Sequence, residues 1–329
     1  MITSVTFRRF KALRHTQLEL APFNLIVGPN GSGKTSLIQA VLQLRNLAPL
    51  PLATEPPPAD APEGPEIRFQ LTHPGPLAVS MHCREHRRCD ALRLIDGDAA
   101  SWPAARDRLG AVQVYLLDHY AIAAPSLPTD GRTVHGNGGN LATVVGHWRE
   151  ALPATYQAFH DEALGLFPEY DDLRVKEAES CRLTVALRLT DEQDWVEADS
   201  LSQGTLYALA LCAIAHEPAP APIICIEELD RGLHPRLLRQ VRDVVYRLSY
   251  PSDYGLEREP VQVIATTHSP YLLDLFRDHP EEVVIAEKRG REASFTRLAD
   301  HPDLDQLLEE GSLGDIWFAG LLGGVPEDS

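Results

Sequence analysis

Apolar and polar residues follow two different periodicities along the 329-residue chain. Residues 2–27 alternate or run apolar in the manner of strands, and residues 36–48 have the spacing of a helix. Between them lies a glycine-rich turn. Short alternating stretches between residues 67 and 117 predict antiparallel strands joined by turns. The pattern therefore predicts a strand–turn–helix unit followed by a β-rich lobe.

The second half of the chain alternates strands with helices. Helical spacing recurs in three segments, residues 140–166, 204–216 and 235–249. The two longest apolar strands, residues 222–227 and 261–268, flank the last of these helices. This alternation is typical of a parallel sheet covered by helices, so we expect an α/β fold. We expect one head built from four consecutive segments, residues 1–48, 49–118, 119–200 and 201–329.

Composition indicates the compartment and the kinds of partner to expect. Residues 49–66 are rich in proline and acidic, which predicts an exposed loop. No apolar run has the length of a membrane span, and the N-terminus lacks the apolar stretch of a signal peptide, so we expect a cytoplasmic protein without a membrane partner. Five cysteines without a regular framework agree with a reducing compartment. The formal charge of −17 does not favour tight, unaided DNA binding.

The strongest local motif is GPNGSGKT, which fits G-x-x-x-x-G-K-[ST] at every fixed position. Glycines let successive backbone N–H groups face a phosphate, and the helix that follows adds the positive end of its dipole. The lysine reaches the outer phosphates, and the threonine hydroxyl faces magnesium. The predicted nucleotide-binding residues here are Gly28, Pro29, Asn30, Gly31, Ser32, Gly33, Lys34, Thr35 and Ser36.

Two adjacent acids end the apolar strand at residues 222–227. We expect Glu227 to hold Mg²⁺ together with Thr35, although it is one methylene longer than the aspartate usual at this position. Glu228 is the candidate general base that polarises the water attacking the γ-phosphate. Solvated acids at a strand end are the simpler interpretation when the two glutamates are taken alone.

Three further motifs come later in the chain. The stretch LSQG lies at the start of an apolar helix, LDRGLHP follows the two acids, and TTHSP lies at the end of a buried strand. Together with the phosphate loop they resemble the ATPase heads of the RecF/SMC/ABC superfamily. The resemblance is greatest to stand-alone RecF-like AAA family ATPases related to OLD-type proteins. It implies a P-loop NTPase fold of the ABC/RecF head type, in which a mixed sheet has helices on both faces, with a β-rich lobe and a helical lobe.

The resemblance also implies roles for residues outside the phosphate loop. Two heads would form an ATP-dependent homodimer with shared nucleotide sites, in which Ser202 and Gly204 of one subunit contact the γ-phosphate held by the other. His268 would sense that phosphate from the same subunit as Lys34. The remaining candidates are Asp230 of the D-loop and Gln113 as the Q-loop glutamine, which equally fits an outward-facing strand residue.

Several alternatives stay open. Cys83, His86 and Cys89, with His82 adjacent, could suggest zinc, but neighbouring arginines and the lack of a closed pattern of two ligand pairs favour a polar hairpin. We expect an ATPase that switches a separately encoded effector, such as a nuclease, or DNA, in repair or phage defence. A transporter subunit and an ATP-occupied binding module with negligible turnover are the alternatives. Trp317, Phe318 and Leu321 would offer an apolar patch for a partner, or pack onto the chain's own core.

Overall fold

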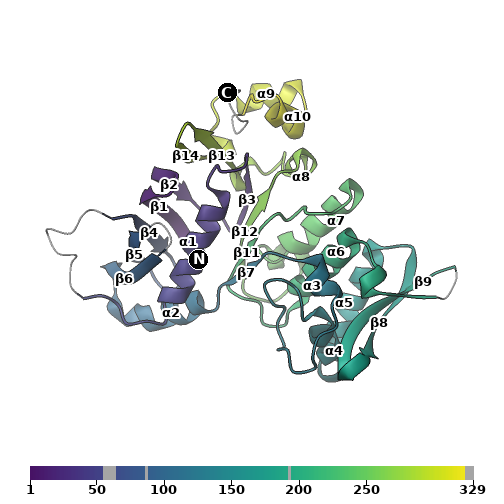
Figure 1. The fold of residues 1–329 in the computed structure, drawn as a ribbon. Helices are drawn as coiled ribbons and strands as arrows, with labels where there is room; N and C mark the ends of the chain where they lie inside the picture. The colour runs from purple at the N-terminus through teal and green to yellow at the C-terminus, as the bar shows by residue number, and fades with distance from the viewer. Residues whose placement is uncertain (55–63, 86–87, 192–193, 323–329) are drawn as a thin grey trace. The chain divides into compact units, whose positions relative to one another are not determined.

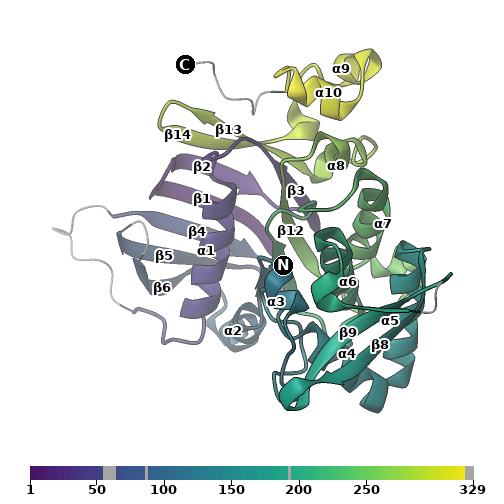
Figure 2. The same cartoon turned by 45° about the vertical axis from the view of Figure 1, so that its right-hand side comes forward.

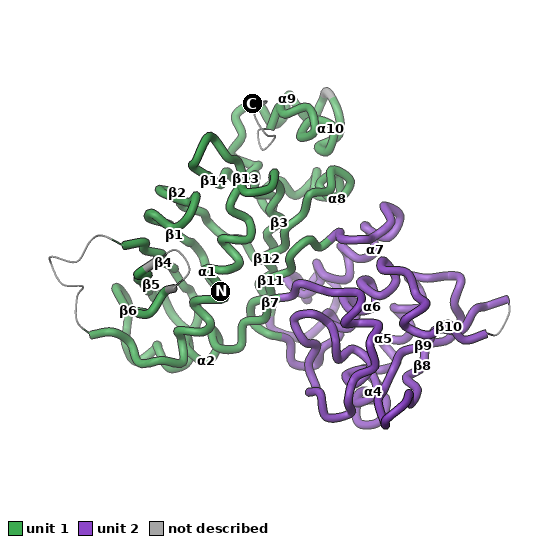
Figure 3. The backbone as a smooth tube through the Cα atoms, viewed as in Figure 1, with its two compact units in different colours: residues 1–114, 221–229, 260–329 green, residues 115–220, 230–259 purple. Residues whose placement is uncertain are grey.

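The computed structural model describes residues 1–54, 64–85, 88–191 and 194–322. These residues form two compact units with interleaved chain segments (Figure 3). The first unit contains residues 1–114, 221–229 and 260–329, and the second contains residues 115–220 and 230–259. Residues 201–329, expected as one segment of the head, thus contribute to both units, and the division of the head into four segments stays a prediction. The reason for the shared segment is the order along the chain, in which a short strand of the first unit comes after one helix of the second unit and before the next.

A sheet of six strands carries the first unit, in the order β14-β13-β3-β12-β11-β7 (Figure 1). Its strands are β3 (Phe23–Val27), β7 (Gln113–Tyr115), β11 (Ile223–Ile226), β12 (Gln262–Thr267), β13 (Val283–Arg289) and β14 (Glu292–Arg297). β13, β3, β12 and β11 pair in parallel, whereas β14 returns antiparallel to β13. Every residue of β3, β11 and β12 is buried, as expected for strands covered on both faces. The parallel sheet predicted from the apolar strands is confirmed.

The β-rich lobe is a second, antiparallel sheet of five strands in the order β2-β1-β4-β5-β6 (Figure 2). Its strands are β1 (Ile2–Phe10), β2 (Leu13–Glu19), β4 (Glu66–Leu71), β5 (Leu77–Glu85) and β6 (Arg88–Gly97). Helix α1 (Lys34–Leu47) contributes its apolar side to one core together with residues of both sheets. Helix α2 (Trp102–Gly110) packs into the same core through its buried residues. The start of α1 is therefore fixed by the packing of its body.

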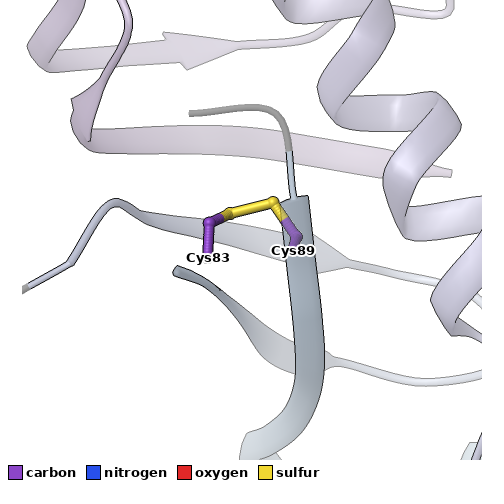
Figure 4. The surroundings of a disulfide bond; sticks show 2 residues. All are labelled: Cys83 and Cys89. Carbon is purple, nitrogen blue, oxygen red and sulfur yellow. A yellow bond between two sulfur atoms is a disulfide. The ribbon is translucent and has the colours of Figure 1, made fainter. Parts of the chain in front are cut away.

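Cysteines join the β5–β6 hairpin of this lobe. A disulfide links Cys83 to Cys89 (Figure 4). The five cysteines show no regular framework in the sequence, yet this pair is bonded, because the hairpin register places the two residues opposite each other. Cys181, Cys212 and Cys225 are free. His86, the third ligand considered for zinc, lies outside the described residues.

Short helices follow β12 and β14 in the C-terminal part of the first unit. They are α8 (Pro270–Asp274), α9 (Leu304–Glu310) and α10 (Leu313–Phe318). α10 packs on α8, where a Cβ at Gly314 would lie 2.6 Å from the carbonyl oxygen of Pro270. Trp317 is buried, while Phe318 and Leu321 are exposed. The expected apolar patch therefore loses its tryptophan, which packs against the chain's own core.

The second unit is the helical lobe. Its helices are α3 (His119–Ala123), α4 (Leu141–Ala151), α5 (Pro153–Leu166), α6 (Gln203–His216) and α7 (Pro235–Tyr246). Its antiparallel sheet has the order β10-β9-β8 and consists of β8 (Tyr170–Ala178), β9 (Arg182–Leu189) and β10 (Trp195–Glu197). Residues 204–215 of α6 are all buried, because α6 is apolar all round and is packed by α5 and α7.

Two sequence-based expectations fall partly outside this description. The proline-rich loop at residues 49–66 includes residues 55–63, which the structure does not describe. The C-terminal stretch continues into residues 323–329, which are also outside it. None of the described helices is both long enough and apolar enough to span a bilayer.

Candidate nucleotide site

The phosphate loop lies between the end of β3 and the start of α1, as predicted. Gly33 has φ +96°, a left-handed conformation that a side chain would strain. Gly28 is required for a different reason, because a Cβ there would lie 2.2 Å from the carbonyl oxygen of Ala286 in β13. The loop therefore curls tightly while its backbone lies directly against β13.

Lys34 is the buried cation of the loop. Its Nζ donates hydrogen bonds to the carbonyl oxygens of Gly28, at 2.6 Å, and Pro29, at 2.8 Å. Burial lowers the pKa of Lys34 to about 8, while the carboxylates of Glu228 and Glu227 act in the opposite direction. The ammonium is thus held inside the curl of the loop, where an anion can replace one of its carbonyl partners.

Glu227 and Thr35 form the oxygen pair expected at a magnesium site. The Thr35 hydroxyl donates to Oε2 of Glu227 at 3.2 Å. Burial raises the pKa of Glu227, and the hydrogen bond from Thr35 opposes this effect. A hydroxyl and a carboxylate are hard oxygen ligands of the kind Mg²⁺ prefers, directly or through water.

Glu228 has a backbone conformation that a non-glycine residue rarely adopts, with φ +52°. Its N–H donates to Oγ1 of Thr266 at 2.9 Å, and the N–H of Leu229 donates to the carbonyl oxygen of Thr266 at 2.9 Å. These bonds to β12 hold the strained turn, and the Glu228 side chain is exposed. Strain maintained in this way is common where a side chain must be aimed for function.

His268 comes directly after β12, and Ser269 caps the following helix by accepting from the N–H of Leu272 at 3.2 Å. The phosphate loop, the two glutamates and His268 therefore follow the carboxyl ends of β3, β11 and β12. In open α/β sheets this edge is where ligands bind. Gln113, in contrast, starts β7, the edge strand beside β11.

Whether the residues fit a nucleotide can be tested on one buried atom. The hydroxyl oxygen of Ser32 is buried, and it has no hydrogen-bond partner among the described residues. A buried hydroxyl without a partner costs free energy unless a ligand satisfies it. With Lys34 beside it and Thr35 facing Glu227, the loop fits a phosphate group and Mg²⁺.

Comparisons with known proteins agree with this geometry. Residues 137–274 match a family model described as "AAA domain, putative AbiEii toxin, Type IV TA system", and residues 4–43 match one described as "AAA domain". Among solved structures, an SmcHead bound to the C-winged helix domain of ScpA matches with a TM-score of 0.61 and 14% identity, covering 90% of this chain and 97% of that one. The chain has the fold of an SMC/RecF-like ATPase head.

Two further SMC heads support the same fold. The SMC head domain from Thermotoga maritima matches with a TM-score of 0.51 and 14% identity, over 90% of this chain and 98% of that one. The Smc head domain with a coiled coil and joint from Pyrococcus yayanosii matches with a TM-score of 0.54 and 11% identity, over 94% of this chain and 99% of that one. A search of curated proteins gives no match. The P-loop NTPase head expected from the motifs is thereby confirmed as the fold.

Ser202 and Gly204 of the LSQG stretch, which is the predicted signature motif of the head, belong to the second unit. Ser202 caps α6, because its hydroxyl accepts from the N–H of Thr205 at 3.1 Å. Gly204 is buried against the D-loop, where a Cβ would lie 2.6 Å from the carbonyl oxygen of Gly232. The predicted D-loop is the stretch LDRGLHP at residues 229–235, in which the carbonyl oxygen of Asp230 accepts from the N–H of Leu233 at 3.1 Å. The signature and the D-loop are therefore one packed structure, which the motif spacing alone did not indicate.

A second polar cluster of the helical lobe also escaped the sequence analysis. Possible metal-ligand atoms of Glu162, Cys212 and His216 lie within 4.8 Å of one another. Arg247 already neutralises Glu162, with Nη1 donating to Oε1 at 2.7 Å and Nη2 bonding to Oε2. Burial lowers the pKa of His216 and so favours its neutral form. The cluster thus forms a paired network that joins α5, α6 and α7.

Proposed function

We propose that this head binds and hydrolyses ATP with Mg²⁺, and that two copies share nucleotide sites in an ATP-dependent homodimer. The observation that carries the proposal is the placement of Lys34, the Thr35–Glu227 pair and Glu228 at the carboxyl ends of β3 and β11, two strands of one sheet. Nucleotide-driven dimerisation would switch a separately encoded effector. The fold similarity to SMC heads supports this proposal, and one such head is bound to ScpA in its solved structure.

Each residue has a distinct task in this proposal. Lys34 and the loop N–H groups bind the outer phosphates, and Ser32 donates its hydroxyl, which has no hydrogen-bond partner among the described residues. Thr35 and Glu227 hold Mg²⁺, which when bound offsets the charge of the phosphates. Glu228 accepts a proton from the attacking water, which its exposed carboxylate can reach from the strained turn. His268 contacts the γ-phosphate from the same subunit, whereas Ser202 and Gly204 contact it from the other.

The test separates binding from hydrolysis. Glu228→Gln should bind ATP but hydrolyse it at least ~100-fold more slowly, because the general base is lost. Glu150→Gln, which removes an exposed carboxylate from α4, is the matched control and should keep normal turnover. Equal turnover of wild-type protein and Glu228→Gln would exclude Glu228 as the base.

Dimerisation is tested on the trapped variant. Light scattering should show a dimer of Glu228→Gln only with ATP, and adding Ser202→Arg should abolish it by placing a bulky cation in the shared site. Ser252→Arg, at an exposed position of the same unit, should leave the dimer intact. A trapped variant that stays monomeric at saturating ATP would refute the shared site.

A further inference from the structure

Strand β13 extends beyond the end of β3. The parallel register places Val283 opposite Leu25 and Ile285 opposite Val27, the last residue of β3. β3 then turns into the phosphate loop, whereas β13 continues to Arg289. The last residues of β13 therefore run beside the phosphate loop.

Alternate residues of this extension face the loop. Gly28 packs so closely on Ala286 that a Cβ at Gly28 would lie 2.9 Å from the Ala286 Cβ. Two residues further, Nζ of Lys288 lies 3.5 Å from the position of a Cβ at Gly31, in the middle of the loop. Side chains two apart in a strand share a face, so both point to the loop.

Lys288 is the available cation of this strand end. Arg289 pairs with Glu287 at 3.2 Å. Lys288 is exposed, and no hydrogen bond or ion pair engages it within the part of the chain that the structure describes. Its ammonium is thus free to meet a ligand on the loop.

Lysine is rare in this chain, which makes its positions informative. Lysine and arginine together number 30, yet lysine occurs only at positions 11, 34, 176 and 288. Lys34 lies within the loop, Lys288 beside it, and Lys176 bonds to Glu197 in the other unit. A lysine ammonium is a compact point charge that can meet a phosphate oxygen from a flexible stem, unlike the rigid fork of arginine.

The charge of the site also favours a second protein cation beside the Mg²⁺ that Thr35 and Glu227 would hold. Glu227 and Glu228 face a single buried lysine, Lys34, and a nucleoside triphosphate adds further negative charge. We propose that Lys288 is a second phosphate-binding cation of the head, which contacts the outer phosphates of a nucleoside triphosphate from the open side of the phosphate loop. This inference rests on the proposed ATP-binding function and adds a residue that no motif marks.

Calorimetric titration with a non-hydrolysable ATP analogue and Mg²⁺ tests the contact. Lys288→Met keeps most of the side-chain length and should weaken binding on the order of tenfold, as expected for loss of a charge-assisted hydrogen bond. Arg289→Met removes the same charge from the neighbouring position and should stay within about twofold of wild-type affinity. Lys288→Arg should recover part of the loss. Unchanged affinity of Lys288→Met, or an equal loss in Arg289→Met, would overturn the inference.

Amine labelling tests the same contact without a mutation. Wild-type protein is acetylated with and without the analogue, and modification is read by mass spectrometry at the four lysines. The analogue should protect Lys288 and leave Lys176 unchanged, whereas equal labelling of Lys288 in both samples would contradict the contact. If the wild-type protein binds no analogue, the proposed function itself fails. If it binds and Lys34→Ala loses binding while Lys288→Met does not, only the present inference fails.

Discussion

The hydroxyl of Thr35 and the carboxylate of Glu227 lie 3.2 Å apart, although 192 positions separate them in the chain. Thr35 is in the first turn of α1, and Glu227 directly follows β11. Their contact joins the phosphate loop to the acidic strand end before any ligand is considered. Each partner supplies an oxygen, so the pair defines where Mg²⁺ would lie.

Glu227→Gln should therefore weaken the binding of magnesium more than the binding of nucleotide. The amide keeps the size of the side chain but removes the charge that attracts a hard cation. We expect the Mg²⁺ concentration for half-maximal ATPase activity to rise on the order of tenfold, with a smaller change in magnesium-free nucleotide affinity. Magnesium titrations of turnover and of analogue binding measure the two effects. An unchanged magnesium requirement would exclude Glu227 as the metal-holding acid.

Lys34 predicts a pH dependence of nucleotide binding. Its pKa of about 8 lies below its ordinary value of 10.5, because burial disfavours the charged form. A bound phosphate favours the charged form, so binding should take up a proton above pH 8 and weaken by about tenfold per pH unit there. Titration calorimetry between pH 7 and pH 9.5 checks this. Lys34→Ala should bind analogue weakly at every pH, and a wild-type affinity independent of pH would contradict the assignment.

The lowered pKa of Lys34 also predicts how the stability of the nucleotide-free protein changes with pH. Between pH 8 and 10.5 the unfolded state retains the Lys34 proton that the folded state has lost, so the unfolded state binds more protons. The free energy of unfolding should therefore rise with pH in this window through this group. Lys34→Met should remove that part of the rise, as measured by urea unfolding of both proteins at pH 8 and pH 10.

The sequence predicted the elements that carry a contiguous motif or a long apolar run. The phosphate loop is a contiguous motif whose glycines have local reasons to be there, and β11 and β12 are apolar enough to identify as inner strands. The motifs also supported the head fold, which the SMC-head matches confirm. The roles of the individual site residues remain predictions.

Features that depend on backbone pairing or tertiary contacts, and not on a contiguous motif, were missed. The strained φ of Glu228 depends on bonds to Thr266 in another strand. The Cys83–Cys89 disulfide depends on the register of a hairpin whose tip lies outside the described residues. Lys288 carries no motif, and only the register of β13 against β3 brings it to the loop.

The positive φ of Glu228 predicts that glycine is no less stable than alanine at this position, the opposite of the usual order. At an ordinary position glycine is less stable than alanine by roughly 0.5–1 kcal/mol. At φ +52° the alanine Cβ is strained by about 1–2 kcal/mol, which glycine avoids. Glu228→Gly should therefore be as stable as Glu228→Ala or more so, while both variants lack turnover for want of the carboxylate. Denaturant unfolding of the two proteins decides it, and a clear deficit for Glu228→Gly would show that the turn is not strained.

Gly204 predicts how closely the signature helix packs on the D-loop. Alanine at this position would bring its Cβ to 2.6 Å from the carbonyl oxygen of Gly232, a backbone atom that cannot move without shifting the loop. We expect Gly204→Ala to destabilise the protein by about 1–3 kcal/mol, the usual cost of overpacking.

Gly165→Ala is the matched control in the same unit. A Cβ at this helical position meets no atom within 4 Å, so the variant should gain a few tenths to about 1 kcal/mol from helix propensity. Thermal and urea unfolding measure both variants. The ATP-linked dimer of the Glu228→Gln background should weaken with Gly204→Ala and persist with Gly165→Ala, because only the former displaces the start of α6 that carries Ser202. A stable Gly204→Ala protein with an unchanged dimer would mean that the contact between the signature and the D-loop can relax without consequence for the shared site.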